Sequence, residues 1–89
     1  MEQNQNRTLL EEAQTLLSET TQAYADVRKQ LSKEDRRQIK GYLSDMRKYL
    51  SRASRGSIGA ADEMDIRHGM LLLRTSLGGL RELGKSNTR

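Results

Sequence analysis

The side chains that perform acid–base, nucleophilic and metal chemistry are sparse in this 89-residue chain, and their spacing forms no familiar site. No cysteine is present, and the one histidine, His68, is interpreted as an ordinary, partly exposed residue rather than a catalyst, a pH switch or a zinc ligand. A catalytic carboxylate pair needs two acidic groups in one cleft, whereas the acidic residues here are scattered. The stretch RGSIGAADE (55–63) lacks the lysine and the spacing of a phosphate-binding loop. The sequence therefore predicts a protein that is not an enzyme and that holds no metal or cofactor.

Positive charge gathers in the middle of the chain and offers a second kind of chemistry, the binding of anions. Residues 33–55 carry eight basic and three acidic side chains, whereas residues 1–32 carry three basic and five acidic ones. At about 100° per helical residue, the basic side chains beside the expected apolar stripe are Arg36, Lys40 and Arg47, and those opposite it are Arg37, Lys48 and Arg55. All of these except Arg55 are candidates for a basic binding surface.

Two interpretations of this charge stay open. This basic surface of the second helix could bind nucleic-acid phosphate or an acidic protein. It could instead be the hydrated face that an amphipathic helix turns to water. The only aromatic residues, Tyr24, Tyr42 and Tyr49, fall on or beside the apolar stripes, so the charges lack interleaved stacking platforms for single strands. We favour the hydrated face and keep a small basic nucleic-acid-binding or regulatory protein as the alternative.

The last third of the chain contains more apolar residues than one buried helix face can absorb. Met64, Leu71 and Leu72 point away from the face on which the other apolar residues of 62–83 recur. Isolated leucines are common on the surface of small bundles. We give equal weight to the interpretation that the run GMLLL forms a second contact surface, with a homodimer or a neighbouring domain as the partner.

Three helices are expected to position these groups, because apolar residues recur at steps of three and four. The first, over 7–31, is predicted to bury Leu9, Ala13, Leu16, Thr20, Tyr24, Val27 and Leu31. The second, over 33–53, is predicted to bury Ile39, Leu43, Met46, Leu50 and Ala53, flanked by Tyr42 and Tyr49. The third, over 62–83, is predicted to bury Ile66, Met70, Leu73, Leu77 and Leu80.

Capping signals mark the start of the second helix. Ser32 precedes Glu34 and Asp35, which is a variant of the capping box with aspartate in the usual place of glutamate. A serine oxygen there accepts a free backbone N–H, and the two carboxylates suit the positive end of the helix dipole. Ser32 is therefore predicted to cap the second helix, which Gly41 weakens from within.

The boundaries of the third helix are read from glycine and serine. Residues 54–61 are rich in both and are predicted to form a flexible loop, with Ile58 as its candidate anchor on the bundle. Asp62 is predicted to cap the helix and Gly84 to end it in the left-handed conformation. The glycine pair 78–79 is expected either to allow close approach of a neighbouring backbone or to mark early fraying.

Together these elements predict an all-α fold, an antiparallel three-helix bundle that forms one domain over residues 1–89, with loose ends at 1–6 and 85–89. No apolar run approaches the ~20 residues that span a bilayer, and the first ten residues do not resemble a signal peptide. We expect a soluble, cytoplasmic protein that does not bind membranes.

The first two helices resemble the C-terminal helical lid of the DnaK family, the seventy-kilodalton heat-shock chaperones. In that family a leucine pair and a threonine lead through a turn to the pattern L-S/P-x-E-D/E-R-x-x-I and a second helix. The matching positions here are Leu16, Leu17, Thr20, Val27, Leu31, Ser32, Glu34, Asp35, Arg36, Ile39, Leu43 and Leu50. The stretch DIRHGMLLLRTSLGGL resembles the next lid helix through Asp65, Ile66, Arg67, Leu73 and Leu77.

This resemblance covers about residues 9–83 and implies a chaperone-like, stress-response module that acts through protein contacts. In the family the lid closes over bound unfolded peptide and slows its escape, so the implied partners are a neighbouring chaperone domain, a client, a co-chaperone or a second copy. The chain departs from the family in its longer loop between Leu50 and Ile66 and in its basic charge. It also lacks the ATPase and peptide-binding domains, so neither ATP binding nor peptide-gripping residues carry over.

Overall fold

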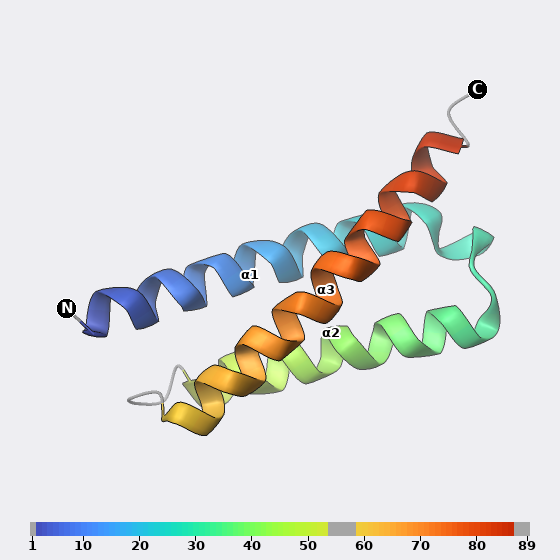
Figure 1. The fold of residues 1–89 in the computed structure, drawn as a ribbon. Helices are drawn as coiled ribbons and strands as arrows, with labels where there is room; N and C mark the ends of the chain where they lie inside the picture. The colour runs from blue at the N-terminus through green and yellow to red at the C-terminus, as the bar shows by residue number, and fades with distance from the viewer. Residues whose placement is uncertain (1, 54–58, 87–89) are drawn as a thin grey trace.

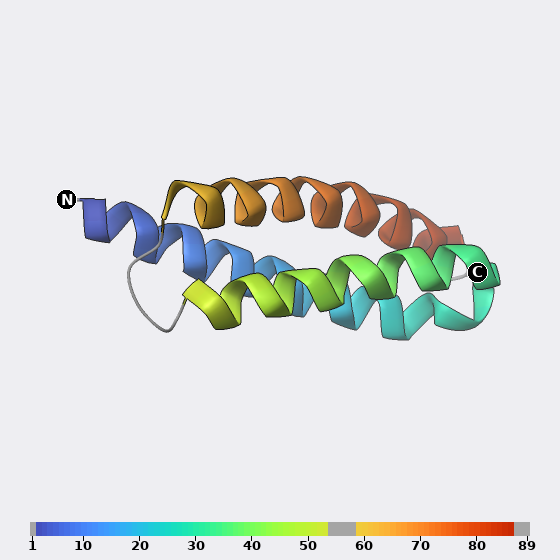
Figure 2. The same ribbon diagram turned by 90° about the horizontal axis from the view of Figure 1, so that it is seen from below.

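The computed structural model describes residues 2–53 and 59–86, with side chains for 8–53 and 59–85. These residues form helix α1 (Glu2–Val27), a short 3-10 helix η1 (Arg28–Gln30), α2 (Lys33–Ala53) and α3 (Ala60–Ser86). Helices α1 and α2 lie side by side and α3 crosses both obliquely, while the view from below shows α2 and α3 running in opposite directions (Figures 1 and 2). Every pair of helices is in contact, which confirms the antiparallel three-helix bundle.

The three predicted apolar faces meet in one core. Its buried members are Leu9, Ala13, Leu16, Tyr24, Val27, Ile39, Leu43, Met46, Leu50, Ala53, Ile66, Met70, Leu73, Leu77 and Leu80. Thr20 is also fully buried, and its hydroxyl donates a hydrogen bond to the Leu16 carbonyl at 2.7 Å, so the polar group is satisfied within its own helix. Tyr42, Tyr49 and Leu31 are half-buried and pack against the core. The spacing of the apolar residues thus predicted the buried faces correctly except at Leu31, which is only half-buried and lies beyond α1, because that helix ends at Val27 and not at residue 31.

The turn between α1 and α2 is short and capped. Leu31 is extended, with φ −84° and ψ 147°, and its N–H donates to the Arg28 carbonyl at 3.2 Å. The N–H of Asp35 then donates to the Ser32 side-chain oxygen at 3.1 Å, and the N–H of Arg36 donates to the Ser32 carbonyl at 3.0 Å. The predicted cap is confirmed, and the tight turn explains why α1 and α2 are antiparallel neighbours.

Replacing Ser32 by alanine is expected to lower the free energy of unfolding by about 1 kcal/mol, because one N–H of the first turn of α2 loses its acceptor. Urea denaturation followed by circular dichroism measures this change. Ser32→Asp keeps an acceptor at the same position and is the matched control, expected to stay within about 0.5 kcal/mol of the native chain. Equal losses in both variants would contradict the capping role.

Two predicted helix starts lie too late in the chain. The first helix begins at Glu2 instead of residue 7, because the polar stretch 2–6 contains no glycine or proline to stop it. The third begins at Ala60 instead of Asp62, and the N–H of Glu63 donates to the Gly59 carbonyl at 3.0 Å. Asp62 therefore lies in the first turn and does not cap the helix. Two alanines, the strongest helix formers, extend α3 beyond the predicted start.

The predicted end of α3 is also wrong. The helix continues through Gly84 to Ser86, and none of the described glycines adopts a left-handed conformation. A Cβ atom on Gly84 would meet Val27 Cγ1 at 3.8 Å, so the glycine packs beside α1 instead of ending the helix. The candidate anchor Ile58 and the basic Arg55 lie outside the described residues.

Both expectations for the glycine pair 78–79 are wrong as well. These residues are helical, and a Cβ added to either would have no neighbour within 4 Å. The close approach of two helices occurs at Gly69, where an added Cβ would lie 2.7 Å from Met46 Cε. Gly69 is buried at the contact between α2 and α3, and its missing side chain makes room for the Met46 methyl group.

Candidate interaction surfaces

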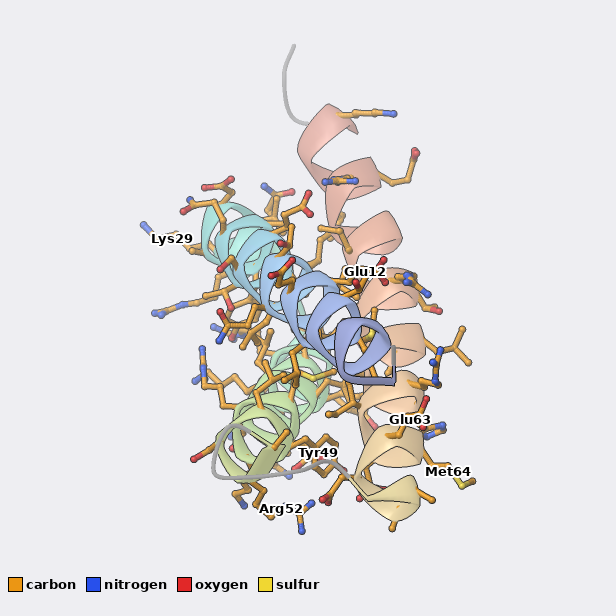
Figure 3. The ribbon with its side chains drawn as sticks, turned by 90° about the vertical axis from the view of Figure 1, so that its left-hand side faces the viewer. Glu12, Lys29, Tyr49, Arg52, Glu63 and Met64 are labelled. Atoms are coloured by element: carbon orange, nitrogen blue, oxygen red, sulfur yellow. The ribbon has the colours of Figure 1, made fainter. Side chains whose placement is uncertain are left out.

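The outer side of α3 carries the exposed apolar residues. Met64 is 71% exposed and Leu71 is 58% exposed, and they are the only large hydrophobic side chains of the described residues that are this open. Figure 3 shows Met64 directed away from α1 and α2. Leu72 is half-buried and does not belong to the side chains packed on the core. The structure thus places two of the three predicted contact residues in water and covers the third in part.

A seven-residue step aligns this surface along α3. Met64, Leu71 and Gly78 are seven residues apart and therefore lie almost directly above one another. His68 and Thr75 fall between them and are exposed, and the Thr75 hydroxyl donates to the Leu71 carbonyl at 3.0 Å. We call these five residues the outer α3 face. It carries no acidic or basic side chain other than the imidazole of His68.

A row of arginines borders the outer α3 face. Arg67, Arg74 and Arg81 also follow a seven-residue step, and all three are exposed. Arg67 donates two hydrogen bonds to Glu63 Oε1, at 3.1 and 2.9 Å, and Arg81 donates to Glu19 Oε2 at 2.9 Å across the contact of α1 and α3. Exposed pairs of this kind contribute about 0–1 kcal/mol each, so they orient the arginines more than they stabilise the fold.

Arg52 links the opposite ends of α2 and α3. Its guanidinium carbon lies 5.5 Å from the centre of the Tyr49 ring, and its Nη2 lies 3.5 Å from Asp65 Oδ2. Figure 3 shows Tyr49 and Arg52 together at the end of the bundle where α3 begins. Arg52 is thereby held at the contact between α2 and α3.

The predicted basic residues of α2 lie on its hydrated side. Arg37, Lys40, Arg47 and Lys48 are exposed, and Arg36 is half-buried. Within the described part of the chain, none of the five lies within 4.0 Å of a carboxylate oxygen. Their charge is therefore uncompensated by near neighbours, unlike that of Arg67 and Arg81.

Two hollows, one between α1 and α2 and one between η1 and α2, are lined by these charges. The first, of about 440 Å³, lies along the contact of the helices, and its polar lining consists of Thr21, Tyr24, Arg28, Lys40, Ser44 and Arg47. The second, also of about 440 Å³, is lined by Arg28, Lys33, Arg36, Arg37 and Lys40. Because they share Arg28 and Lys40, we treat them as one α1–α2 groove. No acidic residue lines either hollow.

The opposite side of α1 has the reverse character. A hollow of about 500 Å³ between α1 and α3 is lined by Glu11, Glu12 and Glu19 together with Arg74. Three acidic residues of α1 therefore line its contact with α3. The α1–α2 groove, by contrast, is lined by basic residues and by no acidic one.

A buried hydroxyl lies at the α1–α2 groove. Tyr24 lines the groove and is only 7% exposed, and its hydroxyl oxygen is buried with no hydrogen-bond partner among the described residues. A hydroxyl in this position costs stability, since it has lost water without gaining a partner. Sequence reasoning missed both Tyr24 and Arg28 as site residues. The antiparallel pairing of the first two helices, which brings Arg28 opposite Lys40, was the signal that could have found them.

Among the described residues no group of three or more histidine and acidic side chains could hold a metal ion. The described helices include none with the length and hydropathy that crossing a membrane requires.

Comparison with models of protein families, with curated proteins and with solved structures found no significant match. The resemblance to DnaK lids therefore stays a prediction.

Proposed function

We propose that this protein is a non-enzymatic helical module that binds another protein through the outer α3 face. The observation that supports the proposal is the exposure of Met64 and Leu71, seven residues apart on one helix. Burying two such side chains against a partner contributes about 1.5–3 kcal/mol for each. The bundle already has a complete core without them, so they are available for a contact outside the chain.

The shape and charge of this surface suit a partner helix. Gly78 adds no side chain to the outer α3 face, and open space surrounds both Gly78 and Gly79. The arginine row along one edge favours a partner with acidic residues beside its own apolar stripe, which directs the choice of partner more than it adds affinity. In the terms of the lid resemblance, this partner is a neighbouring chaperone domain, a client or a co-chaperone, and a second copy of the chain is the alternative.

A double substitution, Leu71→Asp with Leu72→Asp, tests the proposal. We expect it to abolish docking of the partner, seen as lost self-association in sedimentation velocity where the partner is a second copy, while helicity and cooperative unfolding persist, because neither side chain packs on the core. Gln14→Asp with Ser18→Asp adds the same charge to exposed positions of α1 and serves as the matched control. Unchanged association in the α3 variant, or equal loss in both variants, would count against the proposal.

A crosslinking experiment covers partners other than a second copy. A benzophenone amino acid at position 71 is expected to give adducts with a partner in extracts of the source cells, and the same group at position 18 is not. Mass spectrometry of the adduct distinguishes a second copy from another protein. Equal adduct formation at the two positions would contradict a specific surface on α3.

A further inference from the structure

We propose that the α1–α2 groove is a binding site for the phosphates of duplex nucleic acid, contacted by Arg28, Arg36, Lys40 and Arg47, with the Tyr24 hydroxyl as a hydrogen-bond donor. This inference concerns a different face from the outer α3 face and does not depend on protein binding there. It rests on two independent observations, the uncompensated charge of the groove and the buried hydroxyl without a partner.

The first observation is the charge of the groove. Every charged residue of its lining is basic, and Arg28, Lys40 and Arg47 lie outside every ion pair of the described chain. A hydrated helix face normally mixes both signs, as α2 itself does on its other flank with Glu34 and Asp45. Cations held together without acidic neighbours repel one another, and a polyanion removes that repulsion and releases its own counterions.

The second observation is the buried hydroxyl of Tyr24. A phenol can donate one hydrogen bond, and its buried oxygen finds no acceptor in the described structure. The charged neighbours of Tyr24 in the groove, Arg28 and Lys40, offer only donors, and the hydroxyls of Thr21 and Ser44 in the same lining form no hydrogen bond with it, so its donor is available to a ligand from outside the chain. A phosphate oxygen drawn between these two long side chains accepts both from them and from the hydroxyl.

The dimensions and the aromatic residues select the kind of nucleic acid. The basic stripe from Lys33 to Arg47 runs along about 21 Å of helix axis at ~1.5 Å per residue, which is longer than a single phosphate or nucleotide needs. Binding to single strands relies on exposed aromatic rings, yet Tyr24 is buried and Tyr42 and Tyr49 pack on the core. The groove therefore fits the backbone of a duplex, read without regard to sequence.

The test uses the 89-residue protein and a fluorescein-labelled 20-base-pair DNA duplex, with Kd measured by fluorescence anisotropy at 50 to 200 mM NaCl. Four contacts, from Arg28, Arg36, Lys40 and Arg47, give a slope of log affinity against log salt of about −3.6, or a weakening of about 150-fold over this range. The variant Arg28→Gln/Lys40→Gln/Arg47→Gln is expected to reduce the slope to about −0.9.

A matched control separates this site from diffuse attraction. Arg67→Gln/Arg74→Gln/Arg81→Gln removes the same charge from α3, and its slope is expected to stay near that of the native chain. Equal slopes for the two triple variants, or a slope near zero for the native chain, would overturn the proposal. Tighter binding to a 20-nucleotide single strand, or to phosphatidylserine vesicles at equal phosphate concentration, would also overturn it.

Tyr24→Phe tests the hydroxyl alone. We expect it to weaken duplex binding about tenfold at constant salt while thermal stability stays the same or rises, a combination that a purely structural hydroxyl would not give. Tyr42→Phe is the control, since the Tyr42 hydroxyl accepts from Gln38 Nε2 at 2.8 Å, outside the groove. Native affinity in Tyr24→Phe would overturn the assignment of the hydroxyl to the site.

Discussion

Leu73→Ala is expected to lower the free energy of unfolding by about 3 kcal/mol, a large part of the roughly 4–13 kcal/mol available to a domain of this size. Leu73 is fully buried at the centre of α3 and belongs to the core that all three helices share. Truncation removes its apolar contacts and leaves a cavity that the three backbones cannot close without losing other contacts. The bundle has no disulfide to compensate, so the melting temperature is expected to fall by about 12–24 °C.

Leu71→Ala is the matched control for this change. It removes the same atoms from the same helix two residues away, but Leu71 is 58% exposed. We expect its free energy of unfolding to stay within about 0.5 kcal/mol of the native value. Urea denaturation measures both variants, with the same dependence of the unfolding free energy on urea concentration used for each. Similar losses for Leu71→Ala and Leu73→Ala would mean that α3 is oriented differently against α1 and α2.

The contrast between Leu71 and Leu73 also marks how far the sequence predicts the fold. Helical spacing assigned these two residues to opposite sides of α3, and it brought Leu16, Ile39, Leu43, Met70 and Leu73 into one core. The helical repeat of the apolar residues alone decides which face of each helix is apolar. Three apolar faces of similar length can be buried together in few ways. Buried faces are therefore predictable even where helix ends are not.

Helix ends and surface sites were predicted less well, for a physical reason. Whether Asp62 or Gly59 precedes the first turn of α3 depends on differences of a few tenths of a kcal/mol between neighbouring residues. Leu72 points away from the core, yet nearby side chains cover it in part. The α1–α2 groove depends on the pairing of Arg28 with a helix that follows it in the chain, and no local pattern carries that information.

Gly41→Ala/Gly78→Ala/Gly79→Ala is expected to raise the free energy of unfolding by about 2 kcal/mol and the melting temperature by about 8–16 °C. All three glycines lie inside helices with helical φ angles, and an added Cβ would meet no atom within 4 Å at any of them. Alanine therefore removes backbone freedom from the unfolded chain without a clash in the folded one. Each substitution contributes about 0.5–1 kcal/mol by this reasoning.

Gly69→Ala separates this entropic gain from packing, because it makes the same change in α3 where there is no room. The new Cβ would lie 2.7 Å from Met46 Cε, so the methionine methyl group must move within a fully buried site. That displacement offsets the helix gain, and we expect Gly69→Ala to be no more stable than the native chain. Differential scanning calorimetry of Gly69→Ala against Gly78→Ala gives the comparison. An equal rise in the melting temperature of both variants would show that α2 and α3 are separated enough at Gly69 to admit a side chain. The proximity of Met46 to Gly69 would then not constrain how the two helices pack.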